Sequence, residues 1–356
     1  MAIEAKKINF HKVIMTIFIM VAFCTPSNCW SGEFPNKYTK LRAVCASPGA
    51  SVHMVQVAIG KAIEKYTPVR KWMVQPLGGP DVWLPMMRQG QCDFANNNAA
   101  DTLDAFFGRG PYKDMGFQPI RLNAAGHEYF FAFWSIAKSN ITRVEDLKGK
   151  VAYIKFKGDP MFIQMAKLQL ASAGMSFEDL KAAMSFSSVK DAIRQLIEGK
   201  IDAIFFPAVP GPIMQINQAA KECKFVKLTK DQANYVMENS EGYYVQDIPA
   251  NDPRFRNKSA VENAICYQNV MITPEDEPEE VVYEVTKALY DHNDEYCDSH
   301  PACKYWNINH KPISYTVPYH EGAIRYFKEK GLWSAKNEAY QKKILEKQKK
   351  ALTQKQ

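Results

Sequence analysis

Short apolar runs alternate with longer stretches of helical period along most of this sequence. The β-like runs occur at 41–46, 72–75, 94–95, 150–155, 183–186 and 203–206. Between them apolar residues recur every three or four positions, for example at 52–63 and 162–173, which is the spacing of an amphipathic helix. Strands that alternate with helices in this way are typical of parallel sheets covered by helices. The pattern therefore predicts an α/β fold.

The strand–helix pattern repeats at an offset of 109 residues. At this spacing Gly90 corresponds to Gly199, and Asp93 corresponds to Asp202. Each glycine fits the position after a helix, where a positive φ disfavours a side chain. Each aspartate precedes a short apolar strand. Chance similarity between α/β segments is the alternative, but several landmarks with one offset favour a βαβαβ unit that is used twice.

Two such units form two lobes and need strands that connect them. The long apolar run at 126–137 is suited to crossing from the first lobe to the second, and we expect the return at 242–249, before a strand at 264–272. Helices are expected at 274–293, 320–329 and 336–356. The predicted boundaries are 30–126 for the first part of lobe 1, 127–245 for lobe 2, 246–335 for the return to lobe 1, and 336–356 for a basic C-terminal helix. The Lys-rich face of that helix is typical of solvated surface, with a membrane or partner contact as the minor alternative.

The N-terminus has the pattern of a secretory signal. A basic stretch at 1–12 precedes about twelve apolar residues at 13–24 and turn-forming residues at 25–29. The apolar run is too short to span ~30 Å of hydrocarbon at about 1.5 Å per residue. A buried N-terminal helix is the alternative. We expect a signal peptide at 1–29 and export to the periplasm, without a lipid anchor, because Phe23 stands where a lipoprotein signal needs a small residue.

Length and charge narrow the class of protein. The 356 residues suffice for two domains at about 100–200 residues each. With 46% hydrophobic and 23% charged residues, the composition is that of a globular protein. The formal net charge of +7 is mild, and no basic block is interleaved with aromatic residues. A nucleic-acid partner is therefore disfavoured.

Eight cysteines occur, and six would remain after removal of the signal. An even number in an oxidising compartment favours disulfides, and Cys297 and Cys303 are the candidate pair. Free buried thiols are the alternative. Together with His292 and His300 the two cysteines also suggest zinc, but their order differs from the usual pairing of zinc ligands, so no metal is assigned.

Small and polar residues follow every predicted strand. Ligands of open α/β sheets bind beyond the carboxyl ends of the strands, and helix N-termini attract anions. A single loop of this kind would be an ordinary turn, but six loops from two lobes suggest a cleft between them. The candidate ligand-binding residues are Ser47, Gly49, Ala50, Ser51, His53, Gly78, Gly79, Asp81, Trp83, Asn96, Asn97, Lys157, Gly158, Asp159, Pro160, Met161, Pro207, Val209 and Pro210.

Catalytic signals are weak. The chain has no HExxH, GxSxG or GxxxxGK[ST] motif, and its histidines are dispersed. His53 and Asp81 could form an acid–base pair in the cleft, although sequence alone cannot place them together. Ser51 fits helix capping better than nucleophilic attack. We expect no catalytic residue and no cofactor.

Several segments together resemble the TAXI family of solute-binding proteins, which serve tripartite ATP-independent periplasmic (TRAP) transporters. They are, in order, 47–51, 78–79, 87–95, 146–151, Gly158, 199–203 and 281–289, and the likeness covers about residues 38–305. The resemblance implies a two-lobed periplasmic-binding-protein (type II-like) α/β fold. Each lobe would be a mostly parallel sheet flanked by helices, with the ligand cleft between the lobes. It also implies a mostly monomeric receptor that delivers an organic acid or amino acid to membrane permease subunits.

The sequence departs from the family pattern in its loops. Ser51-Val52-His53 replaces Thr-Tyr-Tyr, and Pro80 and Trp83 replace a Ser and an Asn. In the family a Gly-Ser-Gly-Thr loop binds the carboxylate of the ligand; the corresponding residues here, 157–160, are Lys-Gly-Asp-Pro. Asp159 within that loop would oppose a carboxylate, although Lys155 or Lys157 could compensate. An apolar or aromatic acid near Trp83 or Phe130 is the alternative ligand.

The expected function is therefore that of an extracytoplasmic receptor. It would bind a small organic anion or amino-acid-like solute and deliver it to a TRAP-type permease that is driven by an ion gradient. Two alternatives stay open: an exported enzyme on the same scaffold, and a sensory protein that presents its closed form to a partner.

Overall fold

The structure is a computed structural model that describes residues 34–353, except residues 47, 49, 78, 157–159 and 221 and the side chain of Pro160. The expected signal peptide at 1–29 lies outside the described residues. Phe34–Gln356 forms one unit by itself. No helix in the described part of the chain is long and apolar enough to cross a membrane.

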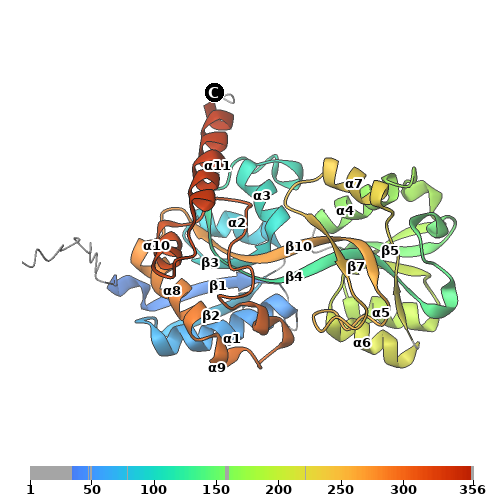
Figure 1. Cartoon of the computed structure of the whole chain (residues 1–356), viewed down its shortest axis with the longest axis horizontal. Helices are drawn as coiled ribbons and strands as arrows, with labels where there is room; N and C mark the ends of the chain where they lie inside the picture. Colours follow the sequence, from blue (N-terminus) through green and yellow to red (C-terminus); the bar gives the residue numbers. More distant parts are fainter. Residues whose placement is uncertain are drawn as a thin grey trace, which may run out of the picture. The chain divides into compact units, whose positions relative to one another are not determined.

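The strands of the described residues hydrogen-bond in the order β2-β1-β3-β10-β4-β7-β5-β6, with β8 beside β4 and β9 beside β10. Their bounds are β1 Lys40–Cys45, β2 Lys71–Pro76, β3 Phe94–Asn98, β4 Ile120–Ile136, β5 Val151–Phe156, β6 Ala182–Phe186, β7 Ala203–Pro207, β8 Cys223–Phe225, β9 Tyr244–Ile248 and β10 Val261–Pro274. β1 pairs in parallel with β2 and β3, and β5 pairs in parallel with β6 and β7. Two parallel halves are thus joined through the antiparallel pair β4–β10 (Figure 1).

Helices cover both halves. Their bounds are α1 Ser51–Tyr66, α2 Pro80–Arg88, α3 Ala99–Phe107, α4 Pro160–Ala171, α5 Val189–Glu198, α6 Pro210–Ala219, α7 Lys230–Glu238, α8 Glu279–Asp291, α9 Asn293–Tyr296, α10 Glu321–Glu329 and α11 Ala335–Thr353. The expected helices at 274–293, 320–329 and 336–356 correspond to α8, α10 and α11. α/β architecture is thereby confirmed.

The internal repeat is visible as one hydrogen-bond arrangement that occurs twice. In the first half the Arg42 N–H donates to Asp93 Oδ2 at 2.7 Å, and the Asp93 N–H donates to the Arg42 carbonyl at 2.9 Å. In the second half Val151 and Asp202 form the same two bonds, each 2.8 Å long. Val151 lies 109 residues after Arg42. Asp93 therefore joins the start of β3 to β1 by hydrogen bonds, and Asp202 joins the start of β7 to β5 in the same way.

Each half has its own hydrophobic core. The first core takes its buried side chains from between residues 41 and 125 and between residues 270 and 344. The second core takes them from 129–267, together with Ala100 of α3. Among the strands, β4 and β10 contribute to both cores. The predicted crossing at 126–137 is confirmed by β4. The segment predicted for the return crossing, 242–249, is instead β9, an edge strand, whereas the strand predicted at 264–272 corresponds to β10, which makes the return to the first core.

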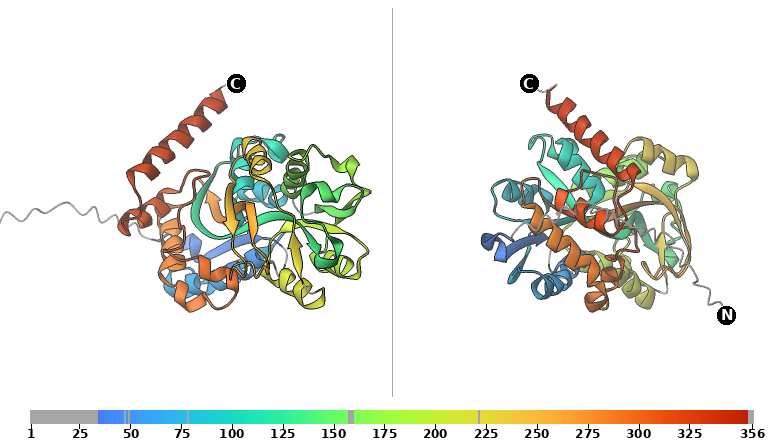
Figure 2. Two further views of the ribbon diagram at one scale, coloured as in Figure 1. Left: turned by 45° about the vertical axis from the view of Figure 1, so that its right-hand side comes forward. Right: turned by 60° about the vertical axis from the view of Figure 1, so that its left-hand side comes forward.

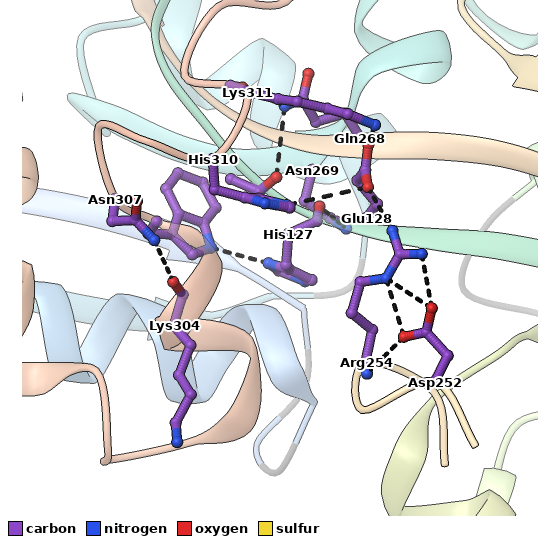
Figure 3. A network of polar contacts seen from close by, with 12 residues as sticks. His127, Glu128, Asp252, Arg254, Gln268, Asn269, Lys304, Asn307, His310 and Lys311 are labelled. Carbon is purple, nitrogen blue, oxygen red and sulfur yellow. Dashed lines mark hydrogen bonds and ion pairs between the residues drawn. The ribbon is translucent and has the colours of Figure 1, made fainter. Parts of the chain in front are cut away.

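A buried carboxylate lies where the crossing strand β4 leaves the first core (Figure 3). Glu128 of β4 is 4% exposed. It accepts hydrogen bonds from Lys311 Nζ at 2.6 Å, from Arg254 Nη1 at 2.9 Å and from the Tyr244 hydroxyl. Burial acts to raise the pKa of Glu128, but the bonds from Lys311 and Tyr244 and the charges of Lys311 and Arg254 outweigh it and lower the pKa. Glu128 therefore ties the loop before β10 to the segment that leads to α10.

The basic helix α11 packs through its first half. The Tyr340 hydroxyl donates to the Thr316 carbonyl at 3.0 Å, and Gln341 exchanges two hydrogen bonds with the backbone of Tyr319. Ile344 is buried, whereas Leu352 is 44% exposed, so the expected apolar stripe ends before the last turns. Those turns extend away from the neighbouring helices (Figures 1 and 2).

Candidate functional site

A cavity of about 780 Å³ lies between the two halves, at the carboxyl ends of their parallel strands. Its described lining from the first half is Ala46, Pro48, Ala50, Ser51, Val52, Gly79, Pro80, Trp83 and Asn96 to Asn98. The second half contributes Phe156, Phe162, Ser187, Val189, Lys190, Ile193, Phe206, Pro207, Val209, Gly211, Pro212 and Gln215. Tyr129 of β4 and Tyr267 and Asn269 of β10 complete it. A volume of this size holds a small organic ligand.

Eight of the predicted residues line this cavity: Ala50, Ser51, Gly79, Trp83, Asn96, Asn97, Pro207 and Val209. Ser47, Gly49, Gly78, Lys157, Gly158 and Asp159 and the side chain of Pro160 lie outside the described residues. His53, Asp81, Met161 and Pro210 are described but do not line it.

Asp81, Met161 and Pro210 turn away because of their places on their helices, and His53 in the first turn of α1 does not line the cavity either. Asp81 is exposed, because it lies on the outer face of the first turn of α2. Met161 faces a separate cavity of about 330 Å³, while its neighbour Phe162, about 100° further around α4, faces the larger one. Pro210 is buried in the first turn of α6. The expected His53–Asp81 acid–base pair is therefore not assembled at this cavity.

Most of the large cavity-lining side chains that the sequence analysis missed are aromatic. Phe156 and Phe206 stand at or next to the carboxyl ends of β5 and β7, so the strand-end rule could have found both. Tyr129 and Tyr267 lie inside long crossing strands, where a sequence pattern does not separate cavity-facing from core-facing positions. The expectation for Phe130 is wrong: its ring is fully buried in the second core, against Phe225 and Phe255.

A chain of hydrogen bonds fixes which way the Asn96 amide points. The Trp72 indole N–H can only donate, and it donates to Gln56 Oε1 at 3.2 Å. The Gln56 Nε2 group is therefore the donor to Asn96 Oδ1, at 2.9 Å. Asn96 Nδ2 remains as a buried donor without a protein partner in the described structure, on a side chain that is 4% exposed and lines the cavity. An unsatisfied donor is thus carried by a side chain that lines the cavity.

The next two asparagines serve the start of α3. Asn97 Nδ2 donates to Thr102 Oγ1 at 3.2 Å, and Asn98 Oδ1 caps the helix by accepting from the Asp101 N–H at 2.6 Å. Burial raises the pKa of Asp101 to about 7, against the opposing hydrogen bonds from Tyr112 and Asn97. Asn96 is consequently the amide in this row that is free to bind a ligand.

Three helices have their N-termini at the cavity, and no side chain caps these N-termini. α1, α2 and α6 begin after Ala50, Gly79 and Val209, none of which carries a hydrogen-bond acceptor on its side chain. In α6 the prolines 210 and 212 remove two N–H groups, and Pro80 removes one in α2. Among the described residues, the first intrahelical bond of α1 runs from the Met54 N–H to the Ala50 carbonyl, so helix geometry leaves the N–H groups of 51–53 without an intrahelical partner. The strongest backbone anion site is therefore the start of α1.

Charge is sparse around the cavity. Of the described lining residues, Lys190 is the one with a charged side chain, and it is exposed at the start of α5. Burial raises the pKa of Tyr129 above its ordinary value, so its phenol stays neutral. The site would hold an anion mainly by dipoles rather than by an ion pair.

The cysteines of the described residues are free thiols rather than partners in a disulfide. All six cysteines between residues 34 and 353 are free thiols, so the predicted Cys297–Cys303 disulfide is wrong. Cys303 turns into the first core, whereas the Cys297 thiol lies against the Asp294 carbonyl. His292 stacks on Tyr66 and His300 caps the next helical turn. In the part of the chain that the structure describes, no three His, Cys, Asp or Glu side chains gather as metal ligands.

Two cores joined by crossing strands, with a cavity between them at the strand ends, are the fold of the two-lobed periplasmic solute-binding proteins. The chain itself belongs to the NMT1-like family, whose family model matches residues 44–331.

One solved structure supports the fold, and two others show a weaker likeness. The chain is similar to PhnD1 from Prochlorococcus marinus in complex with methylphosphonate, with a TM-score of 0.53 and 10% identity over 83% of this chain and 99% of that one. It is also similar to the periplasmic aliphatic sulphonate binding protein SsuA from Escherichia coli (TM-score 0.45, 15% identity, 85% and 91% coverage). For the arginine-, lysine-, histidine-binding protein ArtJ from Geobacillus stearothermophilus the TM-score is 0.43 and the identity 14%, over 75% of this chain and 94% of that one. At such identities the likeness concerns the fold alone.

Proposed function

We propose that this protein is a periplasmic receptor that binds one small organic anion between its lobes and is not a catalyst. The observation that carries the proposal is the cavity of about 780 Å³ that receives side chains from both cores. The uncapped start of α1 and the free Asn96 donor at this cavity favour an anionic group. The methylphosphonate of PhnD1 is likewise an anion.

The lobes we propose are 34–126 with 268–335, and 127–267, followed by the basic helix α11. The predicted boundary at 245 moves to 267 because the second core takes buried side chains up to Tyr267. Bending of β4 and β10 would open and close the cavity between them. The site residues we propose are the eight predicted ones that line the cavity, together with the additional lining residues Tyr129, Phe156, Phe162, Phe206, Tyr267 and Asn269.

As the partner we propose the permease subunits of a TRAP-type transporter, which take up the solute from the closed receptor. The resemblance of the loops at 47–51 and 146–151 to the TAXI family supports this choice over an ATP-driven permease. The receptor would act as a monomer without a cofactor. Uptake of the solute by cells that carry receptor and permease should stop when the ion gradient is collapsed and continue when ATP is depleted; the opposite result would indicate an ATP-driven partner.

Ligand capture is tested on the purified full chain. Denaturation followed by mass spectrometry should release one organic anion in stoichiometric amount. A library of carboxylates, phosphonates, sulfonates and amino acids should contain a compound that raises the melting temperature, because a ligand at a hundredfold excess over Kd stabilises the folded state by about 2.7 kcal/mol. A complete absence of both retained solute and stabilising compound would reject the receptor function.

A further inference from the structure

We propose that the ligand is an aromatic monoanion: its ring contacts Phe156, Phe162 and Phe206, and its anionic group binds the start of α1 beside Asn96. This inference rests on the receptor function and specifies its ligand. It follows from an aromatic cluster that the second half contributes to the cavity and from backbone and amide donors that the first half contributes.

Three phenylalanines of the second half form a continuous aromatic wall. The ring centroids of Phe156 and Phe162 are 5.5 Å apart, those of Phe156 and Phe206 are 5.6 Å apart, and those of Phe162 and Phe206 are 5.4 Å apart. Phe186 packs behind this wall, with its centroid 5.2 Å from that of Phe156. The rings support one another and are held in place before a ligand arrives.

This wall is not fully covered by protein. Phe156 and Phe206 are half-buried, although the rings next to them in the second core, Phe131 and Phe205, are at most 2% exposed. Exposed aromatic surface is unfavourable by about 25 cal/mol per Å², so a ligand ring that covers it gains free energy. Offset or edge-to-face contact with aromatic rings adds about 0.5–1.5 kcal/mol per pair. The wall therefore favours a flat apolar group.

The first half contributes directed hydrogen-bond donors to the cavity. The N–H groups of 51–53 at the start of α1 and the Nδ2 group of Asn96 are donors, and the indole–glutamine relay keeps Asn96 in this orientation. Asn96 is an independent indication of a ligand, because a buried amide donor without a partner costs about 1–3 kcal/mol. An anionic oxygen satisfies both sets of donors.

The described lining has no carboxylate that could pair with a ligand ammonium group. A desolvated ammonium needs such a partner, so an amino acid should bind less tightly than the acid that lacks its amino group. Matched probes separate the features: 3-phenylpropanoate, L-phenylalanine with the added ammonium, propanoate without the ring, and 3-phenylpropan-1-ol without the charge.

Isothermal titration calorimetry on the full chain measures the four affinities. We expect 3-phenylpropanoate to bind at least tenfold more tightly than the other three. Phe206→Ala should weaken it at least tenfold and leave propanoate unchanged. Asn96→Asp, which has almost the same shape, should weaken both acids because it places a carboxylate against them. Phe177→Ala is the control, since that half-buried ring lies against Lys155 and Lys167 instead. Thermal melts verify that each variant is folded.

The outcomes separate the two proposals. If propanoate, glutamate or methylphosphonate binds as tightly as 3-phenylpropanoate, or if Phe206→Ala changes no affinity, the aromatic assignment is wrong and the receptor function stands. Tighter binding of L-phenylalanine or of the alcohol overturns the monoanion assignment. If none of the four probes binds while another library compound does, this ligand class is wrong. If no compound binds at all, both proposals fail.

Discussion

Arg109 and Glu241 form an ion pair that joins the two halves of the protein, with 2.8 Å between Arg109 Nη2 and Glu241 Oε2. Arg109 follows α3, whose phenylalanines belong to the first core, and Glu241 follows α7 of the second core. The Arg109 Nε–H also donates to Asp104 Oδ1 at 2.6 Å. Next to the pair, Gly242 has a φ of +82°, and a Cβ there would lie 2.6 Å from Ala100 Cα. The halves thus touch closely between α3 and the segment that follows α7.

Removing this ion pair should weaken closure. In Arg109→Met the two halves lose a contact that is partly exposed, and such pairs contribute about 0.2–1 kcal/mol. We expect the Kd of the bound solute to rise by a factor of up to about 5, and the salt dependence of binding to decrease. Isothermal titration calorimetry at two salt concentrations measures both.

Arg194→Met is the matched control for Arg109→Met, because Arg194 pairs with Asp191 and Glu198 inside one helix of the second half. It should leave Kd unchanged. Equal affinities for both variants and the wild type would show that the contact between Arg109 and Glu241 does not contribute to closure.

Glu128→Gln should destabilise the protein by about 2–3 kcal/mol, because Lys311 and Arg254 lose their bonds to a charged acceptor. The pKa of Glu128 is lowered, so its contribution is present above the pKa of an unfolded glutamate, about 4.3, and is lost as the pH falls through the lowered pKa. Urea unfolding at neutral pH measures the loss. Glu262→Gln, at an exposed pair with Lys227, is the control and should change stability by less than about 1 kcal/mol. A similar small effect of Glu128→Gln would contradict the prediction.

Features with a local physical requirement could be predicted from the sequence. Gly90 and Gly199 were expected after helices, and they have φ values of +64° and +73°. Asp93 and Asp202 were expected before strands, and both accept from the backbone of a neighbouring strand. Such signals depend on a few adjacent residues, so a single sequence contains them.

Features that depend on long-range pairing could not be predicted. β10 matches the strand predicted at 264–272, but the sequence did not show that Gln268 and Asn269 of this strand bond across to β4, and it placed the return crossing earlier, at 242–249. Gln268 bonds to backbone carbonyls of Gly126 and Lys311, and Asn269 bonds to that of His127. The aromatic wall likewise gathers residues from three separate segments of the second half. Only the packing of these segments identifies it as one surface.

Gly126→Ala should destabilise the protein although the residue lies in a strand. A Cβ at this position would lie 2.2 Å from two atoms of the buried Trp306 ring. Overpacking of this kind costs about 1–3 kcal/mol or more. Adding Trp306→Leu makes room, so the double variant should lose less stability than the sum of the two single variants. Gly211→Ala, where a Cβ meets nothing within 4 Å, is the control. Strict additivity in urea unfolding would show that the two positions do not clash.

His127 should make the protein sensitive to mild acid. Its Nδ1 accepts from the Trp306 indole N–H at 2.8 Å, so the neutral ring carries its proton on Nε2. Burial, together with the charges of His300 and His310, lowers the pKa of His127 from 6.5 to about 3. Between these values the unfolded chain binds a proton that the folded protein does not. Stability is therefore fully present above pH 6.5 and declines as the pH falls towards 3.

At pH 5 this linkage amounts to about 2 kcal/mol, at about 1.36 kcal/mol per pH unit below 6.5. His127→Gln does not titrate but keeps an acceptor for Trp306, so between pH 7.5 and pH 5.0 it should lose about 2 kcal/mol less than the wild type. Urea unfolding at the two pH values measures both differences. Equal pH dependence in the wild type and His127→Gln would mean that His127 is protonated in the folded protein, and the Trp306 bond would then have to be broken, since a protonated Nδ1 cannot accept it.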